Sequence, residues 1–278
     1  MFSSERHEPL LPFPTLPEAV KNRHSISDLA LRPFGIYEND LNVDFSNSPR
    51  PFLVTEILDC CTRDAHGKPI DRNFFWDLTV GTRTECLLRL ISAGEEIPLS
   101  LRCPNIACGR ELEIELTIHE ITELQEQVCK DDAIPVPTSE SRLKLRRPTG
   151  SDQLAWLGKS FDVESEALHQ MLCTLVVEGP KQNLSSPESF EAIGRVMEEH
   201  DPLVNFIVQV QCPDCEQEGV CEIDLEKLSL SRLRQAQLRL LAAVHRLAAH
   251  YHWSEEEIFK VPYWRRDHYL SLLEREEQ

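Results

Sequence analysis

Two stretches of sequence decide the fold. The first is Leu99-Ser-Leu-Arg-Cys103-Pro104, followed by Cys108 and Glu113-Ile-Glu-Leu116; the second is Val208-Gln-Val-Gln-Cys212-Pro213, followed by Cys215 and Glu222-Ile-Asp-Leu225. In each, an alternating apolar and polar strand runs into Cys-Pro, the chain turns at a second cysteine, and another alternating strand leaves. This is the pattern of half a zinc ribbon, written twice. Two halves supply four thiolates, which close a tetrahedral structural zinc site.

The spacing within each pair fits zinc ligands. Two residues separate Cys212 from Cys215 and four separate Cys103 from Cys108, and both gaps are usual for a pair of zinc ligands. We therefore predict Zn²⁺ held by Cys103, Cys108, Cys212 and Cys215. A site closed by four cysteines leaves no open position for catalysis, so the pattern indicates a scaffold or interaction protein and not an enzyme.

Other interpretations of these cysteines stay open. The two pairs could be unrelated reduced thiols or two local disulfides, or a site could use Cys212, Cys215, Cys221 and a histidine. Iron is the other metal that four thiolates hold, and a colourless preparation would exclude it. Alignment of the two stretches places Cys221 opposite Leu112, a core-facing strand position, so we interpret Cys221 as a small hydrophobic residue and not a ligand. The remaining cysteines lie in apolar stretches and are expected to be buried thiols: Cys60, Cys61, Cys86, Cys129 and Cys173.

The charge of the chain limits its partners. Its 278 residues include 29 Lys or Arg and 47 Asp or Glu, for a net charge of −18. This excess repels phosphate backbones, so we expect no nucleic-acid partner and favour a basic protein partner. No apolar run approaches the roughly 20 residues of a membrane-spanning helix, and the first residues lack a signal-peptide pattern. We expect a cytoplasmic protein with reduced thiols and no membrane contact.

Periodicity outlines the remaining elements. Helices are predicted over 16–22, 51–62 and 163–177, from Ser186-Pro187 to Asp201-Pro202, and through the tail, where Ser254 and Glu257 form a capping box. The alternation of Phe74, Trp76, Leu78 and Val80 predicts a strand over 73–80 that Gly81 ends. Thr82 or Thr84 then caps a helix that ends at Gly94. A short strand is predicted at Leu143 and Leu145, and the turn over 148–152 caps the next helix.

These elements predict an α+β fold. Two zinc-knuckle β-hairpins form one zinc-ribbon-like four-cysteine site, surrounded by helices, with a helical C-terminal tail. We expect residues 1–50 to be a partly irregular N-terminal arm. Residues 51–230 form the zinc-knuckle domain, with half-repeats near 70–130 and 143–230, and residues 231–278 form a helical segment that packs on it.

Four stretches together resemble a known family. They are the paired Cys-Pro turns, Arg147-Pro-Thr-Gly-Ser-Asp152, Asp201-Pro202, and a tail that reads His245-Arg-Leu-Ala-Ala-His-Tyr-His-Trp253-Ser-Glu-Glu-Glu-Ile258 and closes on Tyr269-Leu-Ser-Leu-Leu. Over residues 70–275 the chain resembles the baseplate hub assembly chaperones of T-even-type contractile phages, which have relatives in phage-derived contractile injection systems. The first knuckle is longer than the second, and no glycine follows Cys215.

The resemblance implies a non-catalytic assembly factor whose partners are hub, spike or tail-tube proteins. An assembly factor needs an apolar face for its partner, and the tail offers one in Trp253, Ile258, Phe259, Tyr263, Trp264 and Tyr269; the alternative is that most of them form the tail's own core. A stoichiometric structural component of the finished baseplate is the nearest rival. A zinc-ribbon regulator of transcription or nucleic-acid machinery is a rival of another class, and an enzyme is the third choice.

Overall fold

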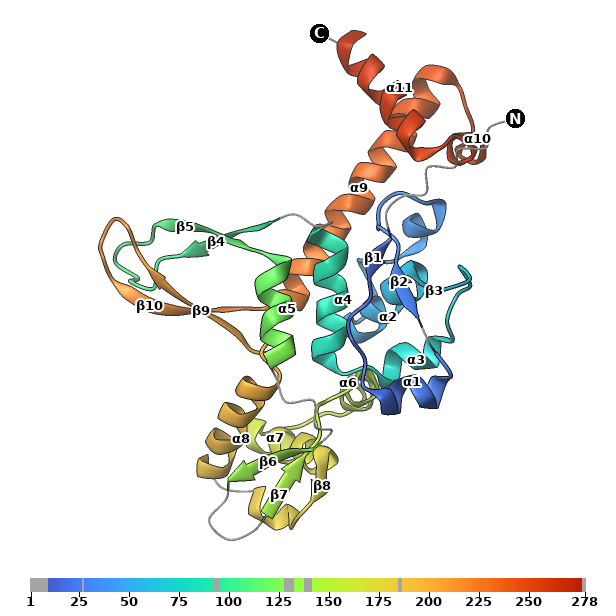
Figure 1. Ribbon diagram of the computed structural model, residues 1–278. Helices are drawn as coiled ribbons and strands as arrows, with labels where there is room; N and C mark the ends of the chain where they lie inside the picture. The colour runs from blue at the N-terminus through green and yellow to red at the C-terminus, as the bar shows by residue number, and fades with distance from the viewer. Residues whose placement is uncertain are drawn as a thin grey trace.

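The computed structural model describes residues 10–26, 28–92, 96–127, 133–137, 142–184 and 187–276. Its described residues form an α+β structure of helices and four small antiparallel sheets. The expectation that helices surround the cysteine hairpins is wrong, because both hairpins extend away from the helices (Figure 1). The longest described helix, α9 (Leu225–Tyr251), runs from the middle of the molecule to α10 (Glu255–Lys260) and α11 (Tyr263–Glu276) at the top of Figure 1. Two β-hairpins project from the middle, and a smaller unit lies below it. None of the described helices combines the length and apolarity that crossing a bilayer requires.

The amino-terminal stretch packs into the largest core. It contains β1 (Leu11–Pro12), α1 (Glu18–His24), β2 (Leu29–Leu31) and the 3₁₀ helix η1 (Glu38–Asn42), and β1, β2 and β3 (Thr62–Asp64) form one sheet. The stretch that we expected to be a partly irregular arm therefore buries side chains beside α2 (Arg50–Cys61), among them Leu16, Leu31, Phe34 and Val43. Gly35, with φ of 85°, lies so close to α9 that an added Cβ would be 2.9 Å from the Cβ of Ala236.

The predicted strand over 73–80 is wrong. Residues Arg72–Asp77 form helix α3, and the side chain of its N-cap Asp71 accepts a hydrogen bond from the backbone N–H of Asn73. Phe74, Phe75 and Leu78 are buried, which is an i, i+1, i+4 helical face. The helix that follows, α4 (Val80–Ser92), includes Gly81 instead of beginning after it. Thr79 is the residue whose hydroxyl accepts from the N–H of Thr82, so neither Thr82 nor Thr84 is the cap.

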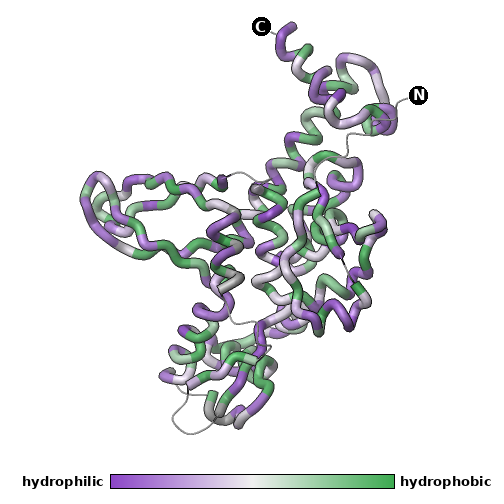
Figure 2. Tube along the Cα trace, in the orientation of Figure 1, coloured by the Kyte–Doolittle hydropathy of each residue, from purple (hydrophilic) through white to green (hydrophobic). Residues whose placement is uncertain are grey.

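The two hairpins have the same local surroundings. The first consists of β4 (Ile97–Arg102) and β5 (Glu111–Leu116), and it lies between α4 and α5 (Ile118–Gln127). The second consists of β9 (Phe206–Gln211) and β10 (Glu218–Ile223), and it lies between α8 (Pro187–His200) and α9. Apolar side chains at the bases of both hairpins share one core with α4, α5 and α9, including Leu99, Leu116, Phe206 and Leu225. Figure 2 shows hydrophobic and hydrophilic residues alternating along the hairpins.

The smaller unit contains the sheet β6 (Ile134–Pro137), β7 (Arg142–Leu145) and β8 (Val176–Glu178), with α7 (Glu164–Leu175), the 3₁₀ helix η2 (Lys181–Leu184) and α8. The strand predicted at Leu143 and Leu145 is confirmed as β7. The cap predicted over 148–152 is also confirmed, because Thr149 and Asp152 form a capping box on α6 (Gly150–Leu157). Gly94, Cys129 and Ser186, which entered the predictions, lie outside the described residues.

A buried arginine joins α4 to α2, α3 and α6. Arg83 is fully buried and donates hydrogen bonds to Pro51 O at 2.6 Å, Phe75 O at 2.9 Å and Thr55 Oγ1 at 3.0 Å. Burial lowers the pKa of its guanidinium to about 10. Gly150 makes room for it, since a Cβ there would lie 2.8 Å from Arg83 Cζ. A side chain at position 150 would therefore collide with the buried guanidinium.

Candidate metal centre

Matching turns position the two cysteine pairs. In the first hairpin, the N–H of Cys103 donates to Arg110 O at 2.8 Å, and the N–H of Cys108 donates to Asn105 O at 2.9 Å. In the second, the N–H of Cys212 donates to Gln217 O at 3.0 Å. Each turn therefore begins directly at the end of a paired strand. The first cysteine of each pair follows the last paired residue of β4 or β9.

Both turns reverse through the left-handed region of backbone space. The residue after the second cysteine has a positive φ in each case: 62° at Gly109 and 57° at Glu216. Glycine adopts this conformation without cost, whereas an L-residue with a Cβ adopts it at about 1–2 kcal/mol. The absence of a glycine after Cys215 therefore does not change the turn. Glu216 adopts the same backbone conformation under strain.

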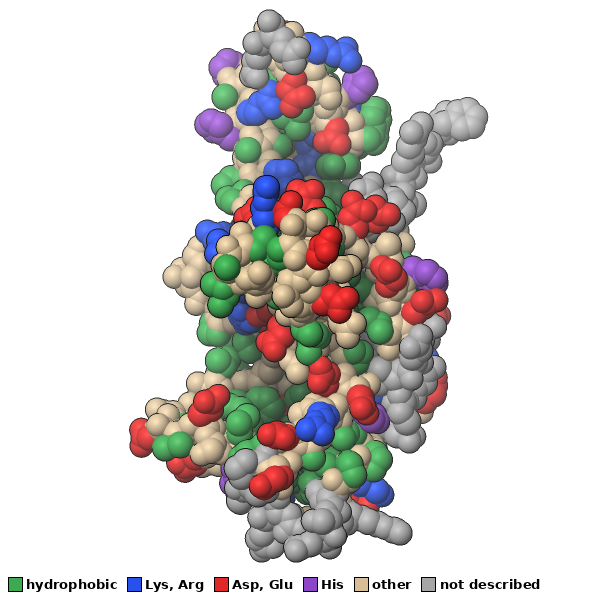
Figure 3. All heavy atoms as spheres, turned by 90° about the vertical axis from the view of Figure 1, so that its left-hand side faces the viewer, with side chains coloured by type: hydrophobic (Ala, Val, Ile, Leu, Met, Phe, Trp, Pro, Cys, Tyr) green, Lys and Arg blue, Asp and Glu red, His purple; other side chains and the backbone are tan. Residues whose placement is uncertain are grey.

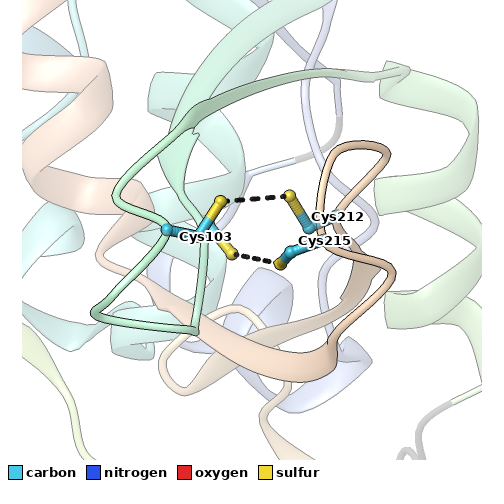
Figure 4. A group of neighbouring side chains, drawn as sticks. Cys103, Cys212 and Cys215 are labelled. Atoms are coloured by element: carbon cyan, nitrogen blue, oxygen red, sulfur yellow. Dashed lines mark hydrogen bonds between the residues drawn. The ribbon is translucent and has the colours of Figure 1, made fainter.

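The two hairpins bring the four predicted ligands together (Figure 4). The Sγ atoms of Cys103, Cys108, Cys212 and Cys215 all lie within 4.8 Å of one another, and Figure 4 shows Cys103 on one hairpin facing Cys212 and Cys215 on the other. Cys103 Sγ is 3.6 Å from Cys215 Sγ, and Cys108 Sγ is 3.9 Å from Cys212 Sγ. Each of these close pairs joins one hairpin to the other, across more than a hundred residues of sequence.

These distances agree with tetrahedral coordination. Four sulfurs about 2.3 Å from a central ion are separated by about 3.8 Å, the edge of the tetrahedron. The observed 3.6 and 3.9 Å lie on either side of this edge. A disulfide would require about 2.0 Å, and all four cysteines are free. The arrangement could thus hold one metal ion between four thiolates.

The protonation of the thiols differs across the cluster. Burial raises the pKa of Cys103 to about 12. Backbone N–H groups of Cys215 and Asp214 hydrogen-bond to the sulfur of Cys212 and lower its pKa to about 7. The pKa of Cys108 is also raised. A metal binds the thiolate and not the thiol, so the lowered pKa of Cys212 favours the form that could bind a metal near neutral pH.

Contacts around the cluster hold the two hairpins together. Pro104 packs directly on Gly219, where an added Cβ would lie 2.5 Å from Pro104 Cβ. Arg110 Nε is 3.1 Å from Asp214 Oδ2. Leu112 and Val210 form a small apolar core with Cys103 and Cys212. The sequence had indicated that Leu112 faces the core, but neither the contact between Pro104 and Gly219 nor the Arg110–Asp214 pair was predicted, although a glycine inside a strand is a signal of close backbone approach.

The other cysteines occupy different surroundings. Cys221 packs against the same small core and its sulfur faces Arg102 O at 3.8 Å. Within the described chain, the sulfur cluster includes neither Cys221 nor a histidine. Cys61 and Cys86 are buried, whereas Cys60 and Cys173 are half-buried.

A second group, Asp40 with Cys60 and Cys61, is a poor metal site. Arg32 donates to both carboxylate oxygens of Asp40, at 2.6 and 3.2 Å. The backbone N–H groups of Gly35, Ile36 and Tyr37 add hydrogen bonds to the same carboxylate. A guanidinium ion thus already occupies the position that a metal cation would take.

The six tail residues predicted to bind a partner fall into two groups. Ile258 is fully buried in the core between α9, α10 and α11, and Trp253, Phe259 and Tyr269 pack against that core. Tyr263 and Trp264 are exposed, at 39% and 59%. The capping box of Ser254 and Glu257 is confirmed at the start of α10. Of the six, the tail therefore offers two aromatic side chains to solvent.

Acidic side chains gather on the hairpins. The hairpin residues 97–116 and 206–223 contain seven Asp or Glu and two Arg. Glu111, Glu113 and Glu115 are exposed on β5, and Glu218 and Glu222 are exposed on β10. Figure 3, in which the hairpins face the viewer, shows more acidic than basic side chains over this part of the surface. This part of the surface therefore has an excess of negative charge.

Comparisons with known proteins give no relative. No protein-family model, no curated protein and no solved structure matches this chain.

Proposed function

We propose that Cys103, Cys108, Cys212 and Cys215 bind one structural Zn²⁺, which makes the two hairpins a pair of zinc knuckles. Four thiolates are the ligand set of many structural zinc sites. The sulfur spacing and the free thiols support this assignment. With four protein ligands the ion has no open position for a substrate, so its role is to brace the hairpins.

We further propose a non-catalytic assembly factor for the baseplate hub of a contractile phage tail or phage-like injection system. The observation that supports this proposal is the convergence of the two sulfur pairs, because the paired Cys-Pro turns are one of the four stretches on which the family resemblance rests. The protein would act by protein–protein binding on a rigid, metal-braced scaffold. Tyr263 and Trp264 are its candidate contacts, since exposed aromatic side chains are enriched in binding hot spots.

Affinity capture from the native cell, followed by mass spectrometry, tests the proposal. We expect hub, spike or tail-tube proteins with the native chain and their loss with Trp264→Ala. Leu157→Ala, which removes a side chain that is 50% exposed on α6, is the matched control and should retain them. Recovery of polymerase or ribosomal subunits instead would contradict the proposal. Stoichiometric amounts of the protein in purified particles would identify a structural component and replace the chaperone role.

A further inference from the structure

A cysteine and a histidine form a hydrogen-bonded pair in the smaller unit, away from the four-cysteine cluster. His169 and Cys173 lie one turn apart on α7, and Cys173 Sγ is 3.5 Å from His169 Nε2. The other ring nitrogen, His169 Nδ1, is 3.2 Å from the backbone oxygen of Leu184 in η2. Both side chains are half-buried.

The contact with Leu184 determines which ring nitrogen carries the proton. A carbonyl oxygen only accepts hydrogen bonds, so Nδ1 must donate to it. In the neutral imidazole, Nε2 is then the acceptor, and it faces the thiol of Cys173. A nucleophile, a base within reach and a third group that orients the base are the three parts of an activated thiol.

The other thiols outside the metal cluster lack this arrangement in the described chain. Cys61 and Cys86 are buried, and burial raises the pKa of both well above its ordinary value. Arg32 donates to the sulfur of Cys60 at 2.8 Å, and the thiol of Cys60 donates to Asp40. A hydrogen bond with Cys61 and the charge of Arg32 lower the pKa of Cys60, so this thiol is the most demanding reference for Cys173, although it has no imidazole as a base. Cys221 faces a backbone oxygen. Cys173 is thus the described thiol outside the cluster whose sulfur faces an imidazole nitrogen able to accept its proton.

We propose that Cys173 is a nucleophilic thiol that His169 activates, and that it reacts with small disulfides to form a mixed disulfide. His169 Nε2 takes the S–H proton, and the sulfur of Cys173 attacks one sulfur of R–S–S–R. The S–S bond of the reagent breaks, and the leaving thiolate takes the proton back from His169. The products are Cys173–S–S–R and RSH. Cys173 is oxidised to a mixed disulfide, and one of the two sulfurs of the reagent is reduced to the thiol RSH. The inference is independent of the zinc site and of the assembly role.

A brief treatment of the full chain with 2,2′-dithiodipyridine, followed by acid quench and peptide mapping, tests this inference. We expect the adduct at Cys173 to form at least about tenfold faster than that at Cys60, and His169→Gln to remove this advantage, as loss of a general base predicts. His200→Gln is the matched control, because its Nδ1 contacts Val196 O on α8. Labelling of Cys60 should not change in either variant.

Two results would overturn the inference. Either Cys173 reacts no faster than Cys60 in the native chain, or it keeps its rate when His169 is replaced. Cys86 is buried, so labelling of Cys86 in a variant shows that the variant has unfolded. If His169→Gln unfolds, the ratio of the labelling rates of Cys173 and Cys60 in the native chain is the test of the inference.

Discussion

Replacing Gly219 by alanine should weaken the metal site without touching a ligand. Gly219 lies in β10 and does not have a positive φ, so alanine fits its backbone. Its Cβ, however, would lie 2.5 Å from Pro104 Cβ, where ordinary contacts are 3.4–4 Å. The two hairpins would have to separate by about 1 Å, whereas metal–ligand distances tolerate about 0.2 Å.

The magnitude follows from the cost of this overpacking. An extra methyl group in a packed contact costs about 1–3 kcal/mol. If the metal-bound form bears this cost, zinc affinity falls about 5- to 150-fold, since about 1.4 kcal/mol corresponds to a factor of ten. Competition with a chromophoric chelator measures the affinity. Pro104→Gly in the Gly219→Ala background should restore part of it, because it removes the atoms that the new Cβ meets.

Gly158→Ala is the control for the extra methyl group. No atom lies within 4 Å of a Cβ at this position, so zinc affinity should stay unchanged. An affinity of Gly219→Ala within twofold of the native protein would refute the reasoning, because the hairpins would then not need their close contact to hold the ion.

Three further predictions concern other parts of the fold. Ile258→Ala should lower the free energy of unfolding by about 2–5 kcal/mol because Ile258 is fully buried. Trp264→Ala should change the free energy of unfolding by less than about 0.5 kcal/mol. Denaturant titration measures both, and equal losses would contradict the division of the tail into core and surface. Gly150→Ala should cost about 1–3 kcal/mol, visible as a lower Tm, because its Cβ would meet the buried Arg83 guanidinium; an unchanged Tm would refute this. Burial raises the pKa of Asp201 from 3.8 to about 7. Between these pH values the folded state keeps a proton on Asp201 that the unfolded state releases. The contribution of Asp201 to stability is therefore fully present below pH 4 and is lost as the pH rises to 7. Tm measured against pH should therefore fall less steeply over this window in Asp201→Asn, and identical slopes would disprove it.

The sequence predicted the four clustered cysteines because their signal is local. Each pair lies at the end of an alternating strand, and the copied flanks imply that the two pairs meet. The capping boxes at Thr149 and Ser254 were predictable for the same reason, since a side chain and a backbone N–H three residues away suffice.

Features that depend on contacts distant in sequence were not predictable. Over 73–80, Phe74, Trp76 and Leu78 alternate as in a strand, but Phe74, Phe75 and Leu78 also fit one helical face, and packing against the core selects the helix. The burial of the amino-terminal stretch depends on the Arg32–Asp40 ion pair and on contacts with α9. The hydrophobic periodicity of the sequence predicts neither of them. The pairing of Pro104 with Gly219 likewise exists only once the hairpins have met.

Native mass spectrometry of the chain, purified without chelators, determines whether the four cysteines hold a metal. We expect one zinc ion per chain, its loss in Cys212→Ser and Cys108→Ser, and its retention in Cys221→Ser. A chain with no bound metal would contradict this expectation, as would a metal that survives Cys108→Ser and disappears with Cys221→Ser.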